Sequence, residues 1–135
     1  MSIYNTARAV LDTKLASVSG LPDVAWENVP YKTDPTVAFL KPTVSPSSRR
    51  PSVVGRSPRQ RLDGLYMILI CTPQDIGTGA AYTYADAITE AFDATTDLPY
   101  TGGYVSVDYS EVRTPYFDSP FYITPVIVGW HTFHI

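Results

Sequence analysis

The chain has 135 residues, 44% of them apolar, and ten Lys and Arg against thirteen Asp and Glu give a net charge of −3. This length and composition allow one hydrophobic core and argue against wholesale disorder, so we expect a single domain over residues 1–135. The one cysteine excludes an intramolecular disulfide, and no apolar run approaches the roughly 20 residues that span a bilayer. The N-terminus lacks the basic and apolar regions of a signal peptide. We therefore expect a protein that is made in the cytoplasm and has no membrane partner.

The first part of the chain predicts one helix and two strands. Ser2 is a suitable N-cap for an amphipathic helix over residues 2–18, which a glycine and a proline then end. Residues 24–29 and 37–44 have the composition of short strands. Pro42 interrupts the second of them, which favours an edge strand or a β-bulge.

The second part predicts a central strand, a second helix and further strands. Residues 65–71 are apolar on both alternating faces, so we expect this strand to be covered on both sides, by helices or by a neighbouring subunit. A glycine-containing turn leads into a helix over residues 78–95, and strands follow at residues 104–109, 112–117 and 122–135. The order of elements predicts an α+β fold with a mainly antiparallel sheet and two helices packed on one face.

Between these two parts lies a basic segment, residues 45–61, which we call the basic arm. The stretch from Lys41 to Arg61 holds six of the ten basic residues and no acid, so its charge of +6 contrasts with −9 for the rest of the chain. Its prolines and the lack of a hydrophobic period predict a long loop between the second and third strands. The candidate partner-binding residues are its arginines, Arg49, Arg50, Arg56, Arg59 and Arg61.

Three interpretations of the basic arm remain open: a solvated loop, a nucleic-acid-binding segment, and an element that docks on an acidic protein surface. Arginine makes bidentate contacts with both carboxylate and phosphate. However, the aromatic residues that would stack on bases are missing between Pro42 and Leu65. No recognition helix, zinc finger or RNA-binding signature accompanies the arm either. We therefore expect a protein surface to be its main partner.

An acidic strip is predicted on the second helix. Asp86, Glu90 and Asp93 are spaced so that they line one ridge of it. Such a ridge is commonly a solvated face, and the functional interpretation is a docking strip for the basic arm of another copy. Head-to-tail pairing of this kind makes a closed ring when the rotation closes. An oligomer is therefore expected, with the apolar strands and the many aromatic residues in its interface.

Catalytic and metal-binding patterns are missing from the sequence. His131 and His134 are three residues apart, which on a strand places their side chains on opposite faces. Cys71 is distant from both and ends an apolar strand, where a thiol acts as a small hydrophobe. Gly77 and Gly79 precede a helix, but the other residues of a dinucleotide or P-loop motif are missing. We expect no metal, no cofactor and no enzymatic activity.

The chain resembles the tail terminator (tail-completion) family of long-tailed bacteriophages. The resemblance lies in the order and spacing of several segments and covers nearly the whole chain. After the N-terminal helix, these segments are Trp26–Pro30, the Arg-rich arm running into Arg61–Tyr66, Gly77–Gly79, Tyr84–Ile88 and Phe92.

The resemblance implies a structural virion protein that forms a ring, commonly of six copies, at the head-proximal end of the tail tube. The ring would end tube polymerisation and provide the head-joining surface for a head-completion or connector protein. The family offers no catalytic residues to carry over. The resemblance also implies synthesis in the host bacterial cytoplasm and contact with DNA only during its passage through the lumen.

The contact made by the basic arm stays open among the tail tube, a neighbouring subunit and the lumen. Its prolines argue against a long regular hairpin, so we expect the arm to become ordered on assembly. The alternatives to a tail terminator are another phage neck, connector or tail tube component, and a small nucleic-acid-binding module.

Overall fold

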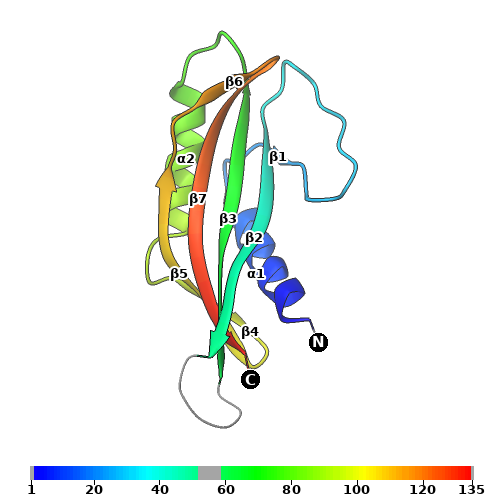
Figure 1. Ribbon diagram of the computed structural model, residues 1–135. Coiled ribbons are helices and arrows are strands. Elements are labelled where there is room, and N and C mark those ends of the chain that lie inside the picture. Colours follow the sequence, from blue (N-terminus) through cyan, green and yellow to red (C-terminus); the bar gives the residue numbers. More distant parts are fainter. Residues whose placement is uncertain (1, 52–58, 135) are drawn as a thin grey trace.

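The structure, a computed structural model, describes residues 2–51 and 59–134. These residues form two helices and one sheet of seven strands, and Figure 1 shows their arrangement. The elements are α1 (Ile3–Ser17), β1 (Asp23–Val24), β2 (Phe39–Pro51), β3 (Gln60–Pro73), α2 (Gly79–Ala91), β4 (Asp97–Tyr100), β5 (Gly103–Val112), β6 (Tyr116–Asp118) and β7 (Phe121–His134).

The strands follow the order β1-β2-β3-β7-β5-β4, and β6 pairs with β7 beside this path. Every pairing is antiparallel except the short parallel contact of β1 with β2. The predicted α+β fold with a mainly antiparallel sheet is therefore confirmed. The strand predicted to be central is β3, which lies between β2 and β7.

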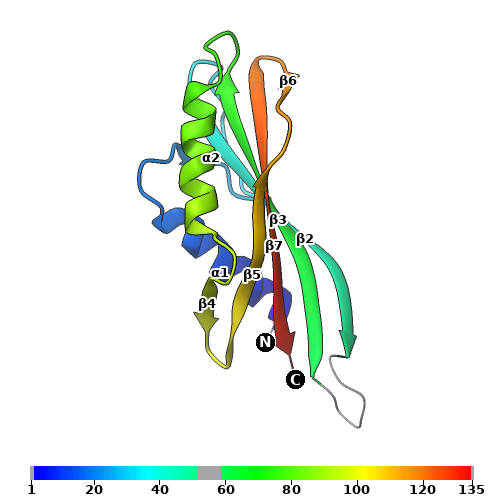
Figure 2. The ribbon, with the colours of Figure 1, turned by 90° about the vertical axis from the view of Figure 1, so that its left-hand side faces the viewer.

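Both helices lie on the same side of the sheet in Figure 2. α1 begins at Ser2, whose side chain accepts a hydrogen bond from the backbone N–H of Asn5. Neither described helix is long and apolar enough to cross a membrane. One face of each helix is buried, through Ile3, Ala7, Leu11 and Leu15 in α1 and through Ala81, Ala85 and Ile88 in α2.

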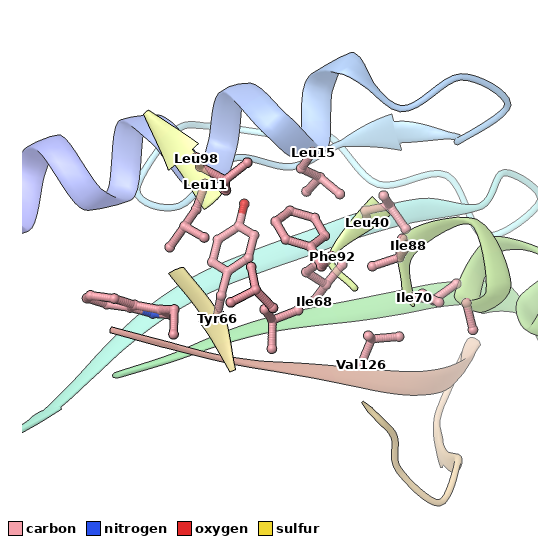
Figure 3. Close-up of a cluster of buried hydrophobic side chains, with 14 of the residues drawn as sticks. Leu11, Leu15, Leu40, Tyr66, Ile68, Ile70, Ile88, Phe92, Leu98 and Val126 are labelled. Atoms are coloured by element: carbon pink, nitrogen blue, oxygen red, sulfur yellow. The ribbon is translucent and has the colours of Figure 1, made fainter. Parts of the chain in front are cut away.

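The main hydrophobic core lies between these helices and the sheet (Figure 3). Tyr66, Ile68 and Ile70 are alternate residues of β3 that are fully buried in it. The Tyr66 hydroxyl donates a hydrogen bond of 2.6 Å to Asp12 on α1. Burial, reinforced by this carboxylate, raises the pKa of Tyr66 above its usual value. The hydrogen bond satisfies the hydroxyl and ties α1 to the sheet.

The residues that the structure describes cover the opposite face of the sheet at one end only. There the segment between β1 and β2 folds back, and Tyr31 packs on Phe39 with ring centroids 5.1 Å apart. Leu69 is partly buried and packs against the cluster formed at this end. The helices lie on the other side, so residues 2–51 and 59–134 leave the rest of this face open (Figures 1 and 2). The buried members of the cluster are Ala25, Phe39, Cys71, Phe121 and Ile123.

Some predicted boundaries differ from the structure. The strand expected at residues 24–29 is only Asp23–Val24; Ala25 still donates a backbone hydrogen bond to Leu40, and Ala25 and Trp26 pack in hydrophobic clusters. The strand expected at residues 112–117 is divided between the end of β5 and the short β6. The helix expected to reach residue 95 ends earlier, and the unpredicted β4 follows it.

The prediction of a long basic loop is wrong for the described parts of the basic arm. β2 and β3 form one hairpin whose pairing extends to Pro51 opposite Gln60. The prolines are tolerated because this length of β2 is an edge, paired with β3 alone among the described strands. A register shift between Pro46 and Ser48 adds a local irregularity. The edge position expected from Pro42 is confirmed.

Candidate interaction surfaces

The described parts of the basic arm lie at one end of the elongated sheet, where β2 ends and β3 begins (Figure 1). Arg49 and Arg50 are exposed on β2. The Nε of Arg49 donates a hydrogen bond to the side-chain oxygen of Gln60 across the hairpin. Arg56 lies outside the described residues. The hairpin therefore presents at least two accessible guanidinium groups on a regular strand.

Arg61 is placed differently from these two arginines. Its Nε lies 3.0 Å from Asp63 Oδ1, and its Nη2 lies 3.9 Å from Asp108 Oδ2. Its guanidinium also lies 6.0 Å from the ring centroid of Phe133. Asp108 in turn contacts the Nδ1 of His131 at 2.7 Å. Arg61 is thus engaged within the chain, and Arg59 also has interaction partners there.

The predicted acidic strip is exposed on the outer side of the helical layer. Asp86 and Glu90 lie on α2, Asp93 follows its end, and all three are exposed. None of them forms an ion pair with a residue that the structure describes. Tyr82 is exposed one helical turn before Asp86. We call these four residues, Tyr82, Asp86, Glu90 and Asp93, the acidic ridge.

The open part of the sheet is a second surface that the sequence pattern indicated. Leu65 and Met67 on β3 are half-buried, as is Ile127, which pairs with Met67 on β7. Tyr109 of β5 is exposed beside Gly129, its partner on β7. We call these residues, Leu65, Met67, Tyr109 and Ile127, the open sheet face. Among the described residues, the expected cover on both sides of the central strand is therefore complete on the helix side, and on the other side it reaches only the end around Phe39.

Sequence reasoning missed an aromatic surface at the end of the molecule opposite the basic arm. Phe117 of β6 is 70% exposed, and its ring lies 4.9 Å from that of Tyr122. Tyr116 of β6 and Ile76, which lies between β3 and α2, are also exposed. Figure 1 shows β6 and the turn after β3 at the same end of the molecule. The available signal was a pair of aromatic residues in a short segment between two prolines. The two ends therefore differ, one being basic and the other aromatic.

The described residues that could act as metal ligands or catalytic groups do not form a common site. The described residues contain no group of three or more His, Cys, Asp or Glu side chains that could hold a metal ion. Cys71 is buried, and burial raises the pKa of its thiol to about 11, which disfavours the nucleophilic thiolate. His131 contacts Asp108 in the network around Arg61.

This fold, with its basic, acidic and aromatic surfaces, defines a small α+β protein of the structural, partner-binding class. A family model described as phage tail terminator protein matches residues 2–130, and the chain belongs to this family. It is therefore a structural component of a phage tail, in a non-enzymatic family whose members interact with other phage proteins.

The comparison with solved structures supports the fold. One solved structure, of a protein without a descriptive name, matches with a TM-score of 0.74 and 20% sequence identity. The match covers 100% of this chain and 97% of the other. No curated protein matches the chain.

Proposed function

We propose that this chain forms a ring, of six copies, that caps the head-proximal end of the tail tube. The ring ends tube polymerisation and presents the surface to which the head-completion or connector protein binds. This function requires a subunit with two unlike ends, one that matches the tube and one that does not continue it.

The difference between the two ends of the sheet is the observation that supports this proposal. The basic hairpin carries Arg49 and Arg50 at one end, whereas Phe117, Tyr116 and Ile76 are exposed at the other. A cationic end and an aromatic end select different partners, because guanidinium groups favour acidic surfaces whereas exposed aromatic side chains favour apolar pockets. A tube that grows by adding subunits to a matching end would stop at a subunit whose outer end does not match the next one.

The basic arm is part of the same proposal. Four of its arginines, Arg49, Arg50, Arg56 and Arg59, contact an acidic surface of the tube or of a neighbouring subunit. DNA meets the ring only in passage through the lumen. Because Arg61 is already paired with Asp63 and Asp108, its role is to stiffen the base of the hairpin, and the exposed arginines make the contact.

The test is to delete the gene for this chain from the phage that carries it. Electron microscopy of the lysate is expected to show tails that are longer than normal and not joined to heads, and the supplied wild-type gene should restore both. Tails of normal length that fail to join would instead identify a head-completion protein. A lysate without tubes would identify a tube protein, and normal joined tails would rule out every one of these roles.

A further inference from the structure

The outer edge of β2 is a long strand edge that faces away from the rest of the sheet. β1 covers it only at Phe39 and Leu40, and beyond them β2 pairs with β3 alone among residues 2–51 and 59–134. The side chains from Ser45 to Pro51 are exposed, and Figure 1 shows this part of β2 at the rim of the sheet. An edge of this kind presents backbone N–H and C=O groups with which a strand of another molecule can pair.

The register of β2 decides which of its backbone groups point outward. The C=O of Leu40 accepts a hydrogen bond of 2.7 Å from the N–H of Ala25, so the backbone groups of Leu40 point toward β1 and away from β3. In an antiparallel ladder, successive residues direct these groups alternately to one side and to the other. The even-numbered residues of β2 therefore point outward as far as Pro46. The register shift between Pro46 and Ser48 moves the alternation by one residue, so odd-numbered residues point outward beyond it.

Prolines occupy three of the five outward positions that follow Leu40. They are Pro42, Pro46 and Pro51, and the other two positions hold Val44 and Arg49. Proline has no backbone N–H, so this edge lacks a donor at most of the places where an added strand would require one. The remaining carbonyl groups accept hydrogen bonds but do not make a ladder by themselves.

The short β1 shows the effect of such a missing donor within the chain. Its ladder with β2 ends with the bond from Ala25 to Leu40. The next bond of a parallel ladder would run from the N–H of residue 42 to the C=O of Ala25. Pro42 has no N–H to donate, and β1 ends at Val24. A strand that is already aligned on this edge therefore stops at the first of its prolines.

The opposite edge of the sheet has the same arrangement. The N–H of Val107 on β5 donates a hydrogen bond of 2.8 Å to the C=O of Thr96, just before β4. Two residues further along each strand, Leu98 pairs with Val105 and is likewise bonded to β5. Pro99 follows Leu98, so its missing N–H would point outward. Every proline of β2 and β4 thus lies at an outward position.

We propose that the prolines of β2 close this edge to strand addition, so that the basic arm meets its partners through side chains and not through its backbone. An inward proline would break a bond to β3, which explains why prolines are missing from the inward positions. That explanation leaves the outward residues free to be of any type, whereas our inference assigns an effect to the prolines found there. The edge then fits a partner that offers acceptors to Arg49 and Arg50 and refuses a partner that offers a strand. The inference does not depend on the ring.

Hydrogen exchange of single amides, followed by NMR in the wild-type chain, tests the geometry. The amides of Val44 and Arg49 point outward and should exchange more than about tenfold faster than those of Thr43 and Ser45, which are bonded to β3. Equal protection of the two sets, in the free chain or in any oligomer that it forms, would overturn the inference. The edge would then be paired in spite of its prolines.

A pair of variants tests the effect of the prolines themselves. Pro46→Thr with Pro51→Thr restores two outward donors at exposed positions and leaves every bond to β3 in place. The matched control is Pro30→Thr with Pro35→Thr, which changes two exposed prolines outside the strands. Both variants lose two proline rings, so both gain the same kind of freedom in the unfolded chain. Should the first variant fail to fold, the single change Pro46→Thr carries the same prediction.

The readout is molar mass in solution over a range of concentrations, combined with amide exchange. The wild-type chain and the control should share one mass profile, whereas the edge variant should form larger species in which the amides of residues 44, 46 and 49 become protected. An edge variant that melts like the wild type, keeps the wild-type mass and leaves these amides unprotected would show that the prolines are only tolerated. Larger species in the control as well would also contradict the inference. The tail-length test is separate from all of these results.

Discussion

The two faces of β3 have the same kind of sequence but different surroundings. Tyr66, Ile68 and Ile70 are fully buried under the helices, whereas Leu65 and Met67 on the other face are half-buried. Apolar residues on both faces of a strand are typical of a strand that is covered on both sides. The described part of the chain supplies one complete cover, on the side of the helices. The comparison suggests that the sequence of β3 is suited to an assembly and not only to the isolated fold.

The largest difference is expected between alanine substitutions on the two faces. Ile68→Ala should lower the free energy of unfolding by about 2–5 kcal/mol, because it opens a cavity in the closed core. Met67→Ala should cost much less in the isolated chain, since its site is already open on one side. Chemical denaturation of both variants measures this difference. Equal losses would show that the open sheet face is packed as tightly as the core.

Glycine substitutions give a second matched pair across the sheet. A Cβ added at Gly64 would lie 2.6 Å from the Trp130 ring, which is buried, so Gly64→Ala should cost about 1–3 kcal/mol through overpacking. A Cβ at Gly129 would lie 2.2 Å from the ring of Tyr109, but that ring is exposed and is able to rotate away. Gly129→Ala should therefore cost less in thermal melting. A larger loss at Gly129 would mean that Tyr109 is held in place.

The pH dependence of stability tests whether the Cys71 thiol is shielded at the covered end of the sheet face opposite the helices. Burial raises its pKa to about 11 in the folded chain, so the unfolded chain loses this proton at a lower pH. Ionisation then favours the unfolded state, and stability should fall as the pH rises from the usual thiol range toward 11. The Cys71→Ala variant should lack this part of the decline. Parallel pH profiles for the two chains would show that the thiol is not shielded.

The smallest effect on stability is expected in the basic arm. Changing Arg49, Arg50, Arg56 and Arg59 to Ser should alter the free energy of unfolding by under about 0.5 kcal/mol per exposed site. Joining of tails should nevertheless fail at low salt, where the wild-type contact is strongest, while Lys32→Ser, an exposed cation elsewhere, serves as the control. Unchanged joining would leave the arm as a solvated hairpin. Steep salt-dependent DNA binding that the arm variant loses would favour the nucleic-acid alternative.

The strongly periodic segments were the predictable part of the fold. The apolar spacing in α1 and the two-sided apolar run of β3 identified a helix and a central strand. β4 was not predictable, because Asp97–Tyr100 is short, contains a proline and is a strand through its pairing with β5. The hairpin form of the basic arm was missed for a related reason. Prolines signal breaks in a sequence, and their edge position is visible only in the sheet.

The candidate surfaces were predictable in part. Helical spacing placed Asp86 and Glu90 on one exposed ridge, which the structure has. Composition grouped Arg61 with the arm, but it pairs with Asp108 of β5, and a contact between residues so far apart in the chain has no local signal. The exposure of Phe117 was missed because an aromatic residue in a strand-like segment is usually buried.

Oxidation of Met67 tests most directly whether the open sheet face becomes covered on assembly. A short pulse of hydrogen peroxide converts an accessible methionine to its sulfoxide, and mass spectrometry of the peptide that contains Met67 gives the rate. The free chain and purified tails would be compared under the same conditions. Our account predicts that the rate falls several-fold in tails. An equal rate in both would contradict it, because the open sheet face would then remain exposed in the assembled particle.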